Sequence, residues 1–174
     1  MLQEKFDLAM DNYLDMSRVV KSDLYWILDM DDNTDHWRRT FLRSSIPLIE
    51  AYCQSFRDMV EVAIDAGIEV SNKNRKAVMD EKSCDAKERI KRNIRTAYEV
   101  FELSPAPDFA CTQWENAKDA IDKRGALMHP ISHQDLDVSE DSYYQYQDGI
   151  VWLYEAVFGV VEKLVIKYGV RASK

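Results

Sequence analysis

The sequence contains little glycine and proline and no long apolar run. Five glycines and four prolines in 174 residues supply few of the turns that a β-sandwich or β-barrel needs, so their scarcity favours helices. No window approaches the roughly 18 uncharged apolar residues of a membrane-spanning helix. The first residues also lack the basic flank and apolar stretch of a signal peptide. We therefore expect a cytoplasmic protein with no membrane segment.

Cysteine is also scarce. Cys53, Cys84 and Cys111 lie far apart, and an odd, scattered set is neither a disulfide framework nor a zinc pattern, which indicates a reducing compartment. His129 and His133 have the spacing of two zinc ligands on one helix, but the proline between them interrupts a helix. The sequence therefore predicts no metal site and no cofactor.

The charge balance limits what the whole surface can bind. The chain has 31 acidic and 23 basic residues, a formal net charge of −8. Nucleic-acid binding depends on cationic contacts to phosphate, so a surface that attracts nucleic acid everywhere is excluded, whereas a local basic site is not. The length and the 46% of apolar residues suit one globular domain spanning residues 1–174.

Apolar residues recur at helical spacing in five long segments. The predicted helices run from about Gln3 to Met30, His36 to Ala66, Asp85 to Leu103, Thr112 to Met128, and from Ser139 or Asp141 to Lys167. The polar segment 71–84 is expected to be a mobile loop with room for a short helix, and residues 130–140 a second polar loop. Five helices with short connections pack most simply as an up-and-down bundle. The sequence thus predicts an all-α fold.

Particular residues mark the helix ends. Thr34 or Asp35 can cap the second helix, and Gly67 can terminate it. Pro47 lies inside it, so either this helix kinks there or a new one starts at Ser44 or Ser45. Pro130 ends the fourth helix and disfavours helical geometry at the residue before it.

The segment Lys123-Arg-Gly-Ala-Leu-Met-His-Pro130 holds the candidate catalytic pair, Arg124 and His129. The guanidinium of arginine is a permanent, forked cation suited to phosphate oxygens, and histidine titrates near neutral pH. Together they can hold a phosphodiester and move its proton. A regular helix turns about 500° over five residues, which separates the two side chains, but a break at His129 removes that objection.

This segment resembles the arginine, four to six residues, histidine motif of the HEPN superfamily, small helical bundles of toxin–antitoxin, abortive-infection and RNA-targeting CRISPR systems. The placement after a long helical hairpin and before one closing helix is also similar. The resemblance implies a metal-independent endoribonuclease, usually a homodimer with two facing motifs. Arg124 would stabilise the scissile phosphate, and His129 would be general base or general acid. The implied products carry a 2′,3′-cyclic phosphate and a 5′-hydroxyl.

One position departs from the family pattern. The residue after the arginine is often polar in active members, whereas here it is Gly125, which offers no side chain to orient the histidine or the phosphate. The alternative is a non-catalytic module of the same type that binds RNA or a protein, such as an antitoxin or regulator.

Further basic and aromatic residues are candidate RNA contacts. Those in the third helix are Lys87, Arg92 and Arg95, and Lys123 precedes the motif arginine. In the second helix Arg38, Arg39 and Arg43 alternate with Trp37 and Phe41, a pattern that also suits stacking on bases. Tyr143, Tyr144 and Tyr146 could form a dimer seam, stack on RNA or pack in the core.

Overall fold

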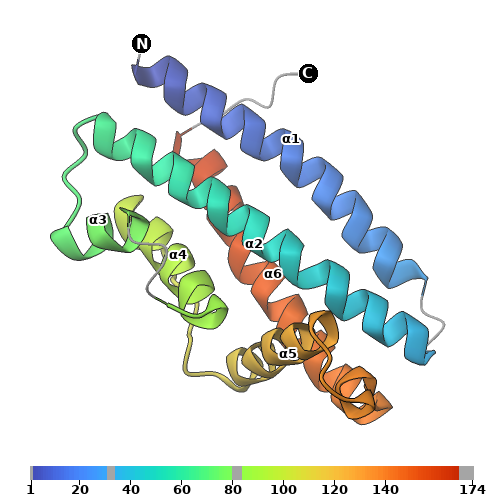
Figure 1. Ribbon diagram of the computed structural model, residues 1–174. Helices are drawn as coiled ribbons and strands as arrows, with labels where there is room; N and C mark the ends of the chain where they lie inside the picture. The colour runs from blue at the N-terminus through green and yellow to red at the C-terminus, as the bar shows by residue number, and fades with distance from the viewer. Residues whose placement is uncertain (1, 31–33, 80–83, 169–174) are drawn as a thin grey trace. The chain divides into compact units, whose positions relative to one another are not determined.

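The computed structural model describes residues 2–30, 34–79 and 84–168. It contains six α-helices and one short 3₁₀-helix, and no strand occurs in these ranges. The elements are α1 (Leu2–Asp29), α2 (Asp35–Asp65), α3 (Asn72–Met79), α4 (Ala86–Val100), α5 (Thr112–Met128), η2 (His133–Leu136) and α6 (Glu140–Tyr168) (Figure 1). The predicted all-α helical bundle is confirmed. No helix of the described part is long and apolar enough to cross a membrane.

The chain divides into two compact units, each assembled from separate segments. The first unit comprises Met1–Val19, Glu50–Pro107 and Ala156–Lys174, and the second comprises Val20–Ile49 and Asp108–Glu155. The first unit therefore holds α3 and α4, and the second holds α5 and η2, while α1, α2 and α6 contribute to both. A single domain over residues 1–174 stays a prediction.

Aromatic rings form the centre of the first unit. Tyr13 lies 5.6 Å from both Tyr52 and Phe56, measured between ring centroids, and Tyr52 meets Phe158 edge-on at 5.5 Å. The Tyr52 hydroxyl donates to the Ser17 carbonyl at 3.2 Å, so this buried polar group is paired. Burial raises the pKa of the neighbouring Cys53 thiol to about 12. These residues form a packed aromatic core.

Two helices of the first unit end in the same way. Gly67 has φ +82°, and the amides of Gly67 and Ile68 donate to Ile64 and Ala63, which is the hydrogen-bond pattern of a Schellman motif. The prediction that Gly67 ends its helix is confirmed. Glu102 has the same left-handed backbone, φ +50°. It ends α4 at Val100 rather than at the predicted Leu103.

In the second unit, α2, α5 and the first part of α6 surround a second aromatic core. Phe41 is fully buried and meets Tyr143 edge-on at 5.4 Å. Trp114 and Trp152 approach each other at 6.1 Å. At the α5–α6 crossing Gly149 lies against Ala117, and both residues are buried. Small side chains let the two helix backbones approach closely.

The structure decides between alternatives that the sequence left open and adds detail to the predicted loops. The described ranges contain six α-helices rather than about five, because the short helix allowed for in the loop 71–84 is present as α3 (Asn72–Met79); residues 80–83 of that loop lie outside the described residues. The loop 130–140 contains η2. Pro47 lies within a single helix, so no new helix starts at Ser44 or Ser45. Thr34 and Ser139 are the caps, each accepting an amide three residues later.

Candidate functional site

The predicted pair lies at the C-terminal end of α5, in the second unit. Arg124 is helical and half-buried, whereas His129 is exposed and follows the last helical residue. His129 has φ −132° and ψ 61°, outside the helical region, although its amide still donates to the Gly125 carbonyl at 3.1 Å. The prediction that Pro130 forces His129 out of helical geometry is confirmed.

Two other hydrogen bonds replace the one that a continuing helix would form at this end of α5. In a longer helix the Ile131 amide would donate to the Leu127 carbonyl, four residues earlier. Instead, the Ile131 amide donates to Oδ2 of Asp135 at 2.8 Å, and the Leu127 carbonyl accepts from Nη2 of Arg43 in α2 at 3.1 Å. Both groups that would extend the helix are thereby occupied, and the chain leaves α5 at His129.

Residues 129–137, called the motif loop below, are held in a defined shape by Asp135. Its Oδ2 atom accepts the amides of Ile131 and Ser132, each at 2.8 Å, and the Ser132 hydroxyl at 3.2 Å. These bonds favour the carboxylate, and the charge of Lys123 adds to their effect, so the pKa of Asp135 is lowered. The loop thus depends on an ionised aspartate.

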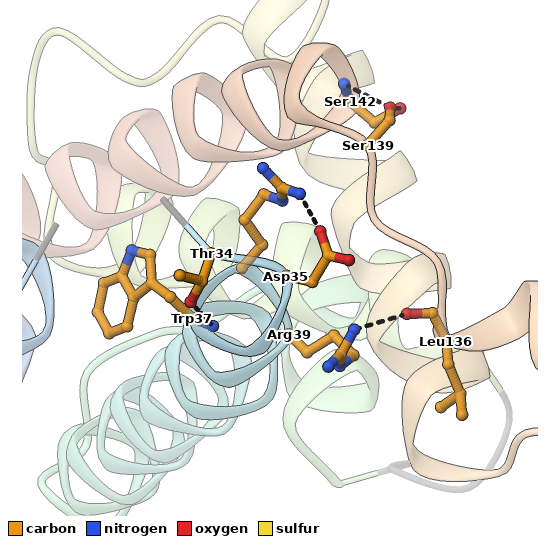
Figure 2. A network of polar contacts seen from close by, with 8 residues as sticks. Thr34, Asp35, Trp37, Arg39, Leu136, Ser139 and Ser142 are labelled. Atoms are coloured by element: carbon orange, nitrogen blue, oxygen red, sulfur yellow. Dashed lines mark hydrogen bonds and ion pairs between the residues drawn. The ribbon is translucent and has the colours of Figure 1, made fainter. Parts of the chain in front are cut away.

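Basic side chains hold the loop from outside. Arg39 donates to the Leu136 carbonyl at 3.4 Å (Figure 2), and Lys123 lies 3.5 Å from the Gln134 carbonyl. Arg39 and Arg43 are one helical turn apart on α2, so they reach the two ends of the segment 127–136 from one helix face. The loop that carries His129 is therefore fixed to α2 and α5.

Arg39, Arg43, Lys123 and Arg124, called the cation cluster below, form no ion pair in the described part of the chain. Among the described residues no carboxylate lies within ion-pair distance of any of the four. Elsewhere the chain does pair its cations, as in Arg89–Glu50 at 2.8 Å and Lys118–Glu115 at 2.6 Å. Lys123 acts on the Asp135 carboxylate at longer range, so the four cations outnumber the one carboxylate that interacts with them. In a protein of net charge −8, such a local excess of positive charge forms a site for an anion.

Arg124 contributes an unused donor to this site. Its Nε atom is buried and makes no hydrogen bond within the described part of the chain. A buried donor without an acceptor costs about 1–3 kcal/mol. The guanidinium as a whole is a group that forms short, charge-assisted bonds with phosphate.

The predicted site residues fall in different places. Lys123, Arg124 and His129 lie in the second unit, but no hydrogen bond joins Arg124 to His129 in the described chain. Lys87, Arg92 and Arg95 lie on α4 in the first unit. Lys87 and Arg95 take part in other interactions.

Most of the candidate stacking aromatics are core residues. Trp37 and Phe41 are 5% and 0% exposed, so the hypothesis that they stack on bases is wrong. Tyr143 is buried against Phe41. Tyr144 is 52% exposed. Among these candidate aromatics of the described structure, it is the one with an exposed side chain.

Apolar side chains flank the exposed histidine. Ile131 is 98% exposed and Met128 is 45% exposed. Because Asp135 holds the Ile131 backbone, this side chain projects from an ordered loop. Exposed apolar residues on a rigid surface are typical of protein contact sites.

The functional residues that the sequence did not reveal are Arg43 and Asp135. The spacing Ser132-x-x-Asp135 is that of a capping box, and the structure contains one there, so this signal was available. The sequence marks Arg43 only as a candidate RNA contact; its bond to a carbonyl 84 positions away has no local signal.

No group of three histidine, cysteine or acidic side chains that could hold a metal ion occurs in the described ranges. Comparison of the chain with family models, with curated proteins and with solved structures finds no match. The functional argument therefore depends on the geometry of the motif loop and on the resemblance of its short motif.

Proposed function

We propose that the protein is a metal-independent endoribonuclease, of the toxin or defence type, that acts through Arg124 and His129. The observation that carries the proposal is the cation cluster beside an exposed histidine. Its four cations form no ion pair in the described structure, and three of them donate to the backbone between residues 127 and 136. This arrangement suits an anionic polymer whose reaction needs a proton transfer.

In the proposed reaction the ribose 2′-oxygen attacks the adjacent phosphorus. His129 accepts the 2′-hydroxyl proton, the O2′–P bond forms, and the P–O5′ bond breaks. The leaving 5′-oxygen takes a proton, which yields a 2′,3′-cyclic phosphate and a 5′-hydroxyl. Arg124 binds the phosphate oxygens on which negative charge increases. Such acid–base catalysis typically contributes 10²–10⁴-fold, and removal of one charge-stabilising donor costs about 10²–10³-fold.

We further propose that the active form is a homodimer. One histidine can serve only one of the two proton transfers at a time, and no hydrogen bond links it to Arg124 in the described chain. Two motifs facing one phosphodiester would provide a base and an acid together, as the resemblance implies. Met128 and Ile131, exposed beside His129, are apolar residues that such an interface would cover.

A second candidate function is a non-catalytic module that binds a partner protein or RNA. The exposed Ile131 on its ordered loop favours this candidate, as does Gly125 beside the motif arginine. An antitoxin or regulatory protein that covers Ile131 would also cover His129, two residues earlier in the chain.

Cleavage of a mixed RNA pool in excess EDTA tests the proposal. Wild type is compared with Arg124→Ala and His129→Ala, and with Arg18→Ala as control because Arg18 forms only a surface pair with Asp15. We expect cutting by wild type and the control, and a loss of at least about 10²-fold in both motif variants. Equal activity in all four proteins would assign the cutting to a contaminant.

A further inference from the structure

We infer that Arg43 and Asp135 are positioning residues that end α5 at His129 and so hold the imidazole where the motif needs it. This inference rests on the proposed function, since it assigns these residues a part in the same reaction. Neither residue belongs to the motif itself. Arg43 lies on α2 and Asp135 in η2.

A longer helix would join the Ile131 amide to the Leu127 carbonyl; here each of these two groups is bound by one of the two residues instead. Asp135 accepts a hydrogen bond from the Ile131 amide at 2.8 Å, and Arg43 donates one to the Leu127 carbonyl at 3.1 Å. Pro130 has no amide proton, so the Ala126 carbonyl also lacks its usual helical donor. With two of these groups bound elsewhere and the third without its donor, α5 stops after Met128 and His129 leaves the helical region, at φ −132° and ψ 61°.

Arg43 also supplies the charge that this helix end lacks. The last turn of α5 contains no basic residue of its own, and the C-terminal carbonyls of a helix carry partial negative charge that repels an anion. A guanidinium donating to one of these carbonyls offsets that charge next to the proposed phosphate position. Because Arg43 donates to the Leu127 carbonyl at 3.1 Å, we assign its effect on the site to this bond and to its charge.

Amide hydrogen exchange tests the structural part without reference to activity. Arg43→Met and Asp135→Ala are compared with wild type and with Arg18→Met, which removes a surface arginine paired only with Asp15. For both test variants we expect the Ile131 and Ser132 amides to exchange at least about tenfold faster. The His129 backbone resonances should move, while Arg18→Met leaves both unchanged. Unchanged exchange in the test variants would overturn the inference.

Steady-state cleavage separates positioning from substrate binding. Positioning predicts that kcat falls by about 10²-fold in each test variant, as misplacement of a catalytic group can cause, with KM changed much less. Arg43→Lys, which keeps a donor for the Leu127 carbonyl, should recover part of kcat. A raised KM with unchanged kcat for Arg43→Met would overturn the inference and make Arg43 a direct phosphate contact.

The same experiments distinguish failure of the inference from failure of the proposed function. If wild type cuts no RNA while exchange responds as expected, the endoribonuclease proposal fails and the two residues remain organisers of the motif loop. If wild type cuts RNA and both test variants retain kcat, the enzyme stands and the positioning role is wrong.

Discussion

Gly149 of α6 lies directly against the backbone of Ala117 in α5. A Cβ atom added at position 149 would be 2.7 Å from the Ala117 Cα and closer still to its backbone nitrogen. No flexible side chain stands between the two helices there, so the close approach requires glycine. The side-chain amide of the neighbouring Asn116 donates to the Asp148 carboxylate at 3.0 Å. This hydrogen bond links the same two helices at the surface.

Gly149→Ala should therefore destabilise the protein strongly. The added methyl group meets backbone atoms that cannot move alone, and overpacking of this kind costs about 1–3 kcal/mol or more. Gly125→Ala is the matched control, because a Cβ at position 125 meets nothing within 4 Å and alanine favours a helix interior by about 1 kcal/mol. Urea unfolding measures both. A Gly149→Ala protein as stable as wild type would show that the α5–α6 crossing is wrong.

The motif loop should lose its anchor in acid. The pKa of Asp135 is lowered by amides that bind its carboxylate, so these bonds stabilise the loop above the ordinary aspartate pKa of about 3.9. They are lost as the pH falls through the lower, folded-state pKa. We expect the Ile131 and Ser132 amide resonances to titrate together with a midpoint below about 3.9. In Asp135→Asn the titration should disappear; a midpoint above the ordinary value would contradict the bonded geometry.

Local patterns in the sequence predicted α5 well. Its bounds, Thr112–Met128, agree with the prediction, because Pro130 and the apolar spacing are both local signals. The end of α4 was predicted too late, since Glu102 takes a left-handed backbone that no glycine announces. The short α3 lies in a polar segment with weak periodicity, and such a helix leaves little trace in the sequence.

The sequence predicted only part of the candidate site, because some of its contacts join residues that are far apart in the chain. Lys123 and the motif pair are neighbours in the chain, so a local pattern finds them. The bond of Arg43 to the Leu127 carbonyl joins residues 84 positions apart. The Arg89–Glu50 pair likewise neutralises a cation for which the sequence shows no nearby partner. Which basic residues have partners is decided by tertiary packing, so composition alone cannot rank them.

Lys123 should contribute to RNA affinity and Lys118 should not. Both lie on α5, but Lys118 pairs with Glu115 at 2.6 Å, whereas Lys123 forms no ion pair among the described residues, donates to the Gln134 carbonyl and acts on Asp135 only at longer range. Each phosphate contact contributes about 0.7 to the slope of log affinity against log salt for single strands. We expect Lys123→Met to weaken binding of single-stranded RNA and to lower this slope by about that amount. Equal effects of Lys123→Met and Lys118→Met would contradict the assignment of the site.

The chemistry of the ends left on cut RNA tests the central claim most directly. Wild-type protein in excess EDTA should leave 2′,3′-cyclic phosphate and 5′-hydroxyl ends, and a substrate with 2′-O-methyl groups throughout should stay intact because its attacking oxygen is blocked. His129→Ala should leave no such ends. Fragments with 3′-hydroxyl and 5′-phosphate ends, or cleavage of the methylated substrate, would contradict attack by the 2′-oxygen and the roles of Arg124 and His129.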